Sequence, residues 1–293
     1  MLGIRKLTHI TQAVRDRDLS HSLYRDVFDA RTFHSGPIDD DGDDDATLVA
    51  FHNLCLKLVS LSDLERQVGR HLATGEGFHA VGFQVEDLKA AEAVLHQEGI
   101  RIILRGPSRL LTDPEDTYGT MFELRESALP SDPRDTPDWH VEKWGHEHPL
   151  GIQDLWGISV LVNDPSSAEA FCRRVLGAHH LQTKITTEIA RSLTFFTVAG
   201  APMALVESAG EASELAKVTG RLKGGQGVHA ICLISGKLQD VPGHFRSRGI
   251  GLLQSPNTRH IPHPRAMMGA RYIFMERPHE DDPRYQRAPT GAG

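Results

Sequence analysis

Two histidines occupy the same place in two closely similar segments of the chain. His79 lies in GEGFHAVGFQVEDL, residues 75–88, and His229 lies in GQGVHAICLISGKL, residues 225–238. An imidazole can bind a metal ion or move a proton near neutral pH, so either residue could do chemistry. A single histidine on an apolar strand is nevertheless more often a packed core residue than a ligand. Which description applies depends on the elements that surround each histidine.

The similarity extends over most of the chain, which marks an internal repeat. Residues 109–126 pair without a gap with residues 259–276, at the offset that also separates His79 from His229 (229 − 79 = 150). Upstream, residues 7–30 pair with residues 155–178. Each of these upstream segments is typical of a strand, a turn with an aspartate that can cap a helix, and an amphipathic helix.

The repeat predicts an α+β fold of four units, each a strand, a helix and two or three further strands. We expect two tandem domains, residues 1–126 and 151–276. Residues 127–150, rich in Pro, Asp and His, read as an irregular linker whose tryptophans pack onto a domain, and residues 277–293 read as a flexible tail.

Composition limits the class of protein. The chain has 293 residues and a formal net charge of −7, which argues against nucleic acid or an anionic membrane as the main partner. No apolar run approaches the length of a membrane span, and the N-terminus lacks the apolar core of a signal peptide. The three cysteines have no metal-type spacing, so we expect reduced thiols in a cytoplasmic protein. The aspartate-rich stretch 36–46 lacks the spacing of a calcium loop and is expected to be a solvated hairpin loop.

The four-unit arrangement resembles the vicinal oxygen chelate superfamily, which includes glyoxalase I, methylmalonyl-CoA epimerase, extradiol ring-cleaving dioxygenases and bleomycin-resistance proteins. The resemblance covers roughly residues 4–126 and 153–276. The stretch LKLVSLSDLERQVGRHLATGEGFHAVGFQVEDLKAAEAVLHQEGIRI, residues 56–102, is most similar to methylmalonyl-CoA epimerase. The resemblance implies that two βαβββ units form a cupped mixed sheet in each domain, flanked by helices.

The resemblance also implies a divalent metal ion in the cup, held by residues on the first and last strands of the units. In the first half, the matching positions carry His9, His79 and Glu123, two histidines and a carboxylate that would leave half of the ion open to substrate. The metal would be Fe, Mn, Co, Ni or Zn. In the second half the same positions carry Gly157, His229 and Ile273, so that domain is expected to be degenerate and to lack a complete metal site.

Lys57 stands at the fourth such position, where relatives often carry Glu or Gln. If its side chain points into the cup, it could transfer a proton or bind an anionic oxygen. A register slip of one residue would instead turn it to solvent, and the pattern leaves both options open. Tyr118, five residues before Glu123, is a second candidate catalytic residue or a turn residue.

These expectations favour a metal-dependent enzyme of the isomerase or lyase type, which moves a proton through a metal-stabilised enolate of a small substrate with chelating oxygens. An Fe(II) extradiol-type dioxygenase is the alternative, and a protein that sequesters a small molecule is the third option. The expected partners are a small-molecule substrate, with no nucleic acid and no membrane. The two halves would form a pseudo-dimer within one chain, which could pair further as a homodimer.

Overall fold

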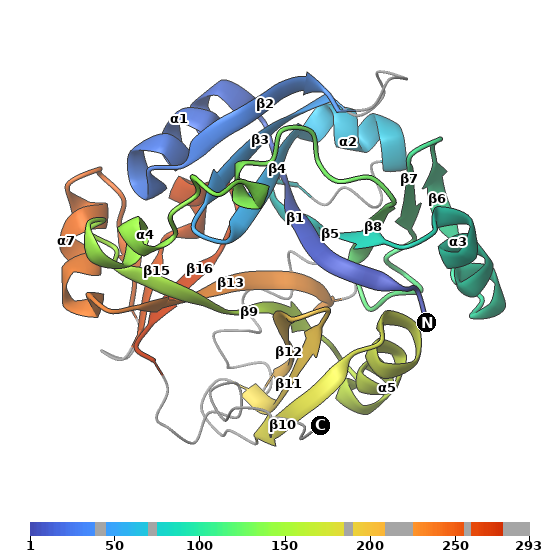
Figure 1. Cartoon of the computed structure of the whole chain (residues 1–293). Helices are drawn as coiled ribbons and strands as arrows, with labels where there is room; N and C mark the ends of the chain where they lie inside the picture. The colour runs from blue at the N-terminus through green and yellow to red at the C-terminus, as the bar shows by residue number, and fades with distance from the viewer. Residues whose placement is uncertain (39–44, 70–74, 185–189, 209–224, 255–258, 278–293) are drawn as a thin grey trace, which may run out of the picture.

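Alternating apolar residues build two mixed sheets of eight strands, as the computed structural model of the chain shows (Figure 1). The structure describes residues 1–38, 45–69, 75–184, 190–208, 225–254 and 259–277. The first sheet has the order β2-β3-β4-β1-β5-β8-β7-β6. Its strands are β1 (Ile4–Val14), β2 (Arg31–Pro37), β3 (Asp45–Phe51), β4 (Leu54–Ser60), β5 (Gly77–Val85), β6 (Ile102–Arg105), β7 (Arg109–Thr112) and β8 (Met121–Arg125).

The second sheet repeats this order with each strand number raised by eight: β10-β11-β12-β9-β13-β16-β15-β14. The predicted fold class, four βαβββ units in two tandem halves, is therefore confirmed. The strands of the second sheet are β9 (Ile152–Leu161), β10 (His179–Lys184), β11 (Ala190–Val198), β12 (Ala201–Ser208), β13 (Gly227–Ser235), β14 (Leu252–Leu253), β15 (Arg259–Pro262) and β16 (Tyr272–Met275).

Aspartates begin the helices as the sequence predicted. Asp16 accepts a hydrogen bond from the backbone N–H of Leu19, and Asp164 makes the equivalent bond in the second half. The helix α2 was not predicted from the pattern. The helices are α1 (Arg17–Phe28), α2 (Leu61–Val68), α3 (Leu88–Gln97), α4 (Glu142–His146), α5 (Pro165–Phe171) and α7 (Val241–Arg246), with the shorter turns η1 (Pro133–Asp135), η2 (Cys172–Leu176), η4 (Leu238–Asp240) and η5 (Pro264–Met267).

One hydrophobic core joins the two halves. It includes Ile10 and Phe122 from the first sheet and Ile231 and Phe274 from the second, all at most 4 % exposed. Figure 1 shows β1 and β5 facing β9 and β13 across the middle of the molecule. The first helix of each half packs on the opposite half, since Phe28 of α1 stacks near Phe274 and Phe171 of α5 stacks near Phe122. The opposite face of the first sheet carries the candidate site and is called the cup below.

Glycines bring the halves together at two equivalent points. A side chain on Gly119 would overlap the backbone carbonyl of Gln226, and a side chain on Gly269 would overlap that of Glu76. Glycines 119 and 269 are matched by the repeat, and so are the Gly-x-Gly segments 75–77 and 225–227 that they contact. The repeated glycines therefore serve the same close backbone approach in both halves.

The segment between the sheets crosses the outside of both halves. β8 ends at Arg125 and β9 begins at Ile152, while the domain boundaries themselves stay a prediction. As predicted, the tryptophans pack inward: Trp144 is fully buried and donates to the carbonyl of Phe28, and Trp139 donates to that of His52. Most of the predicted tail, and residues 39–44 of the aspartate-rich stretch, lie outside the described residues.

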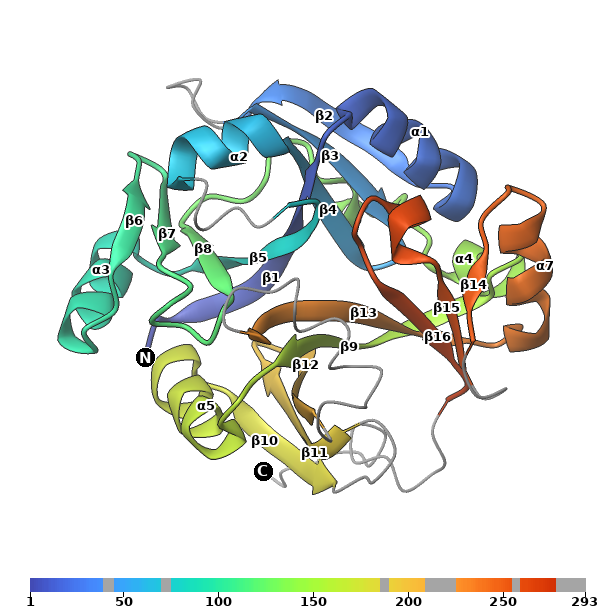
Figure 2. The same cartoon turned by 180° about the vertical axis from the view of Figure 1, so that it is seen from behind.

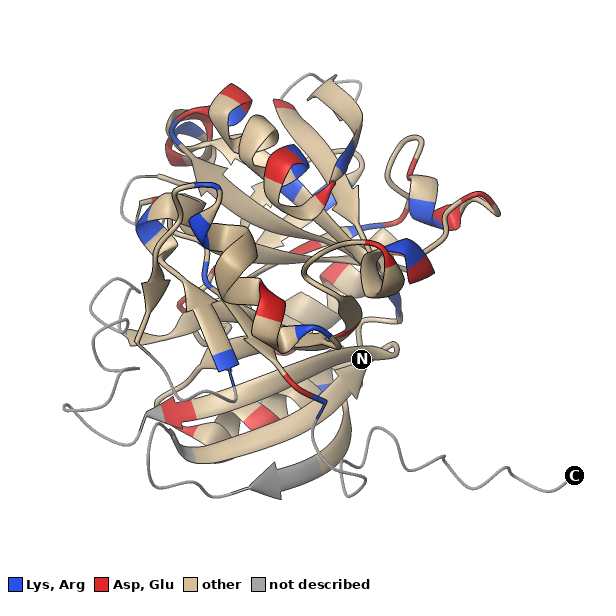
Figure 3. Ribbon diagram, turned by 90° about the vertical axis from the view of Figure 1, so that its left-hand side faces the viewer, with Lys and Arg blue, Asp and Glu red and all other residues tan. Residues whose placement is uncertain are grey.

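Charged residues mark the outside of the fold. Figure 3 shows Lys, Arg, Asp and Glu mainly on helices and loops, whereas the strands are largely uncharged. Charges buried on the sheet therefore stand out and point to a special role. In the described part of the chain, no helix is long and apolar enough to cross a membrane.

Candidate active site

Four adjacent strands bring three of the predicted site residues together on the floor of the cup. In the order β4-β1-β5-β8, Thr11 lies opposite Lys57, while His9 and Glu123 both lie opposite Gly82. This register turns Lys57 into the cup, where it is 1 % exposed, so the alternative of a slipped strand is excluded.

Lys57 and Glu123 form a buried ion pair. The Lys57 ammonium donates to both carboxylate oxygens, with Nζ 3.0 Å from Oε1 and 2.8 Å from Oε2. His9 completes the group, because its Nε2 lies 3.5 Å from Oε2 of Glu123. The structure therefore brings together three of the five residues that the sequence singled out.

Two arginines also reach this carboxylate, and sequence reasoning missed their role. Arg125 lies two residues beyond Glu123 on the same strand face, with Nη1 3.2 Å from Oε1. Arg109, on the neighbouring strand β7, lies with Nη1 4.0 Å from Oε2. The strand alternation gave a signal for Arg125, but the pairing of β7 with β8, which brings Arg109 close, is a long-range property.

The cluster fixes the charge of its members. Burial alone would raise the pKa of Glu123, but Lys57, His9 and Arg109 outweigh it and hold that pKa well below its usual value. Burial lowers the pKa of His9, which Glu123 offsets only in part, so the imidazole is neutral near pH 7. Nδ1 of His9 lies 3.0 Å from Oγ1 of Thr8. A threonine hydroxyl that donates to Nδ1 leaves the imidazole proton on Nε2, facing the carboxylate.

His79 does not join this group. Its Nε2 lies 2.6 Å from the carbonyl oxygen of Gly75, which makes Nε2 the donor and fixes the tautomer. Burial lowers the pKa of His79. This hydrogen bond holds the ring of His79 against Gly75, two residues before β5 begins.

Tyr118 is placed at the contact between the halves. It adopts a left-handed backbone conformation with φ of 55°, and its ring centroid lies 5.5 Å from that of Phe171 on α5. These are the features of a turn residue that packs on the second half, the other option that the sequence left open.

The second half lacks the cluster. The positions of His9, Lys57 and Glu123 are taken by Gly157, Ala204 and Ile273, as the matching pairs across β9, β12, β13 and β16 show. His229 is 5 % exposed, with Nδ1 3.4 Å from Oγ of Ser159, and its Nε2 has no hydrogen-bond partner among the described residues. Burial, assisted by Arg271, lowers its pKa well below the usual value.

The floor of the cup is closed in this structure. His9, Lys57, Glu123, Arg109 and Arg125 are between 0 and 3 % exposed. α2 covers one end of the cup, where its Leu64 and Val68 pack in one apolar cluster with cup residues of β1, β4, β5, β7 and β8 (Figure 2).

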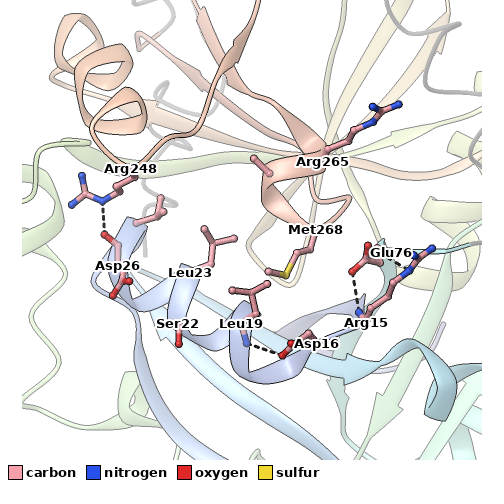
Figure 4. A pocket seen from close by; sticks show the side chains of 12 residues that line it. Arg15, Asp16, Leu19, Ser22, Leu23, Asp26, Glu76, Arg248, Arg265 and Met268 are labelled. Atoms are coloured by element: carbon pink, nitrogen blue, oxygen red, sulfur yellow. Dashed lines mark hydrogen bonds and ion pairs between the residues drawn. The ribbon is translucent and has the colours of Figure 1, made fainter.

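A cavity of about 660 Å³ lies elsewhere, between α1 and the turn η5 of the second half (Figure 4). Leu19, Leu23 and Met268 form its apolar part, and the rim carries ion pairs such as that between Arg15 and Glu76. None of the five site candidates lines it. We therefore place the candidate chemistry in the buried cup and not in this groove.

The described residues do not fit a divalent metal ion in the cup. Among them, no three His, Cys, Asp or Glu side chains come together in a way that could hold one. The Lys57 ammonium already contacts both oxygens of Glu123, the only carboxylate of the predicted triad. At an effective dielectric constant of 20, a dication about 4 Å from an ammonium is repelled by about 8 kcal/mol, twice the value for two unit charges. A charged Lys57 and a bound dication therefore exclude each other.

One family model matches the sequence of the first half. Residues 6–124 match the model of the Glyoxalase/Bleomycin resistance protein/Dioxygenase superfamily. No curated protein sequence matches the chain. The finer likeness to methylmalonyl-CoA epimerase stays a prediction.

Solved structures share the fold of the whole chain. A mutant of 4-hydroxymandelate synthase from Streptomyces coelicolor superimposes with a TM-score of 0.65 at 13% identity, covering 94% of both chains. The 2,3-dioxygenase LapB from Pseudomonas sp. KL28 gives 0.60 at 14% identity and 96% of both chains. The Mn(II)-bound glyoxalase from Novosphingobium aromaticivorans gives 0.55 at 11% identity, covering 94% of this chain and 83% of its own. The chain thus has a tandem fold of the vicinal oxygen chelate type, and its first half matches the model of the Glyoxalase/Bleomycin resistance protein/Dioxygenase superfamily.

Proposed function

We propose that the first half of the chain is the catalytic half of an enzyme of the isomerase or lyase type, which moves a proton on a small substrate whose oxygen gains negative charge. The observation that carries the proposal is the buried group around Glu123, in which three cationic side chains and a neutral imidazole surround one carboxylate. Solved relatives with this fold include enzymes, which supports a catalytic role at the level of the fold only.

The charges suit an enolate. Lys57, Arg109 and Arg125 together exceed the single negative charge of Glu123 by two (3 − 1 = 2). Side-chain cations fixed in a buried site stabilise a developing oxyanion more strongly than mobile solvent does. In this scheme Lys57 and Arg109 contact the substrate oxygen, and no step depends on a metal ion.

The neutral His9 is the group that moves the proton. A histidine kept neutral by burial can accept a proton from carbon at Nδ1, once the Thr8 hydroxyl turns away from that nitrogen, and can return it to the other face or to a neighbouring carbon. When His9 becomes an imidazolium, Glu123 stands 3.5 Å from its Nε2 and stabilises the new charge. Glu123 thus positions His9 and Lys57 and is not itself the base.

Substrate reaches these side chains only after α2 moves, because they are at most 3 % exposed and α2 packs over the cup. α2 has eight residues, and its N-cap Ser60 makes no side-chain capping bond. Displacing this helix therefore costs little free energy.

Proton transfer can be tested without knowing the natural substrate. The purified chain is incubated in D₂O with methylmalonyl-CoA and with a set of small 2-oxo acids, and loss of the C–H signal is followed by proton NMR. Wild type should exchange at least one of these protons without consuming oxygen. The variant His9→Ala should lose exchange, whereas His229→Ala, which changes a buried histidine of the second half, should retain it.

Other outcomes would overturn the proposal. Oxygen uptake with ring opening of a catechol, and no exchange, would favour the dioxygenase alternative. Tight binding of a small molecule with no exchange on any carbon would favour sequestration.

A further inference from the structure

The resemblance places a divalent ion among the residues of the cup floor, yet the structure places a lysine there. The ammonium of Lys57 lies 3.0 and 2.8 Å from the two oxygens of Glu123, so it takes the carboxylate that a metal ion would need. The lysine comes from the last strand of the first unit, one of the strand positions at which the superfamily is expected to carry ligands.

The neighbours of this ion pair also disfavour a second cation. Arg125 and Arg109 lie 3.2 and 4.0 Å from the same carboxylate. Together with Lys57 they already exceed the single negative charge of Glu123, so a further two positive charges would meet an excess of like charge.

The two histidines of the predicted triad do not converge on one point. His79 bonds the Gly75 carbonyl through Nε2, whereas His9 faces Thr8 with Nδ1. Nε2 of His9 has no hydrogen-bond partner among the described residues and lies 3.5 Å from Glu123, so only His9 and Glu123 remain beside Lys57 as potential ligands.

We propose that the Lys57 ammonium takes the place of the metal ion in this cup, so that the first half excludes divalent cations and becomes a metal site only when Lys57 is replaced by an oxygen ligand. The organic cation then does for the substrate oxygen what the ion is expected to do in relatives, and it is covalently attached to the fold. The inference concerns cation binding, so it can be tested whether or not proton transfer is found.

The decisive variant is Lys57→Gln, because it removes the charge and offers an amide oxygen beside His9 and Glu123. Each protein is stripped with a chelator, dialysed against Co²⁺, and assayed for cobalt per chain, for the visible spectrum of the ion and for affinity by titration calorimetry. Lys57→Gln should gain one Co²⁺ and bind it on the order of a hundredfold more tightly than wild type does, because a like charge at contact distance is gone.

The chain has seventeen histidines, and those at the surface can also bind cobalt. Two matched variants distinguish cobalt bound in the cup from cobalt bound at the surface. Lys57→Arg keeps the positive charge and should stay free of stoichiometric cobalt. The double variant Lys57→Gln with Glu123→Ala removes the carboxylate and should lose the ion that Lys57→Gln gained.

Folding does not compromise the test. If Lys57→Gln is unstable, its melting temperature is measured with and without Co²⁺, and the proposal expects the ion to raise it in Lys57→Gln but not in wild type or in Lys57→Arg. The proposal is overturned if wild type binds one Co²⁺ that is lost in Glu123→Gln. It is equally overturned if Lys57→Gln neither binds cobalt nor is stabilised by it.

Discussion

The imidazole ring of His9 occupies the space beside Gly82, on the neighbouring strand, where the first carbon of a side chain would stand. A side chain of even one carbon at residue 82 would overlap three atoms of that ring. Gly82 lies opposite both His9 and Glu123, so this absence of a side chain lets the histidine reach the carboxylate across β5. In the second half the sizes are exchanged: Gly157 takes the place of His9, and Cys232 that of Gly82.

Gly82→Ala should therefore displace the ring of His9 and destabilise the fold by about 1–3 kcal/mol, as overpacking of a close-packed interior does. Urea unfolding followed by circular dichroism measures this. The control is Gly157→Ala on β9, a central strand of the second sheet, where the nearest atom to the added carbon would be at an ordinary 3.6 Å. Equal losses in the two variants would show that His9 is not pressed against Gly82.

Lys57→Met should destabilise the chain by about 3 kcal/mol, because it leaves Glu123 buried without its nearest cation. The double variant Lys57→Met with Glu123→Gln should recover a large part of this loss, since no uncompensated charge then remains. Denaturant midpoints of the two single variants and the double variant give the coupling energy.

A surface ion pair serves as the comparison. Lys143 contacts Asp29 at 3.2 Å with both side chains well exposed, and its ammonium lies 4.0 Å from the ring centre of Trp144, so Lys143→Met should change stability by no more than about 1 kcal/mol. If Lys57→Met proves as mild as Lys143→Met, the pair in the cup does not have the energetic role assigned to it.

His229 should make the protein less stable as the pH falls from about 6.5 towards 5. Its folded pKa is lowered by burial, so the unfolded chain takes up a proton in this range while the folded chain does not. Each such group contributes at most about 1.4 kcal/mol per pH unit, and His9 and His79, also lowered, add to the same slope.

The variant His229→Gln should therefore flatten the dependence of the unfolding free energy on pH between 5 and 6.5, measured by urea titration at each pH. His140→Gln, at an exposed position of the connecting segment, is the control and should leave the slope unchanged. A His229→Gln curve parallel to that of wild type would contradict a buried, neutral His229.

Gly119→Ala should separate the two halves locally. Both Gly119 and Gly249 have φ above +70°, so an alanine strains the backbone by about 1–2 kcal/mol at either position. Only at Gly119 would the new carbon also overlap Gln226 of the other half, whereas nothing lies within 4 Å of it at Gly249. The extra loss of stability in Gly119→Ala, by thermal unfolding, isolates the contact between halves; identical melting temperatures would argue against it.

The repeat made the fold predictable. The succession of strands and helices along the chain, and the aspartate-containing turns that cap helices, could be inferred because the same pattern is written four times and each copy checks the others. The direction of Lys57 could not, because a register slip of one residue leaves the pattern of residues 54–61 intact. Only the pairing of β4 with β1 decides it.

The composition of the site was less predictable for a physical reason. Sequence spacing shows which residues share a strand face, but not how far a long side chain reaches across it. Lys57 spans from β4 to β8, and Arg109 arrives through the pairing of β7 with β8. His79 matches its position in the repeat, yet a local bond to Gly75 determines where its ring nitrogen points.

In the first half a large residue, His9, lies opposite a small one, Gly82; in the second half the small residue is Gly157 and the larger one is Cys232. This exchange constrains how the two halves can diverge. A lineage that regained histidine at position 157 while Cys232 remained would push the ring into an occupied space. Cys232 would first have to be replaced by a smaller residue, and the protein with that single replacement would contain a void with no compensating benefit. Loss of the second cup's histidine is thus easier to make than to reverse, so the asymmetry between the halves tends to persist once it has arisen.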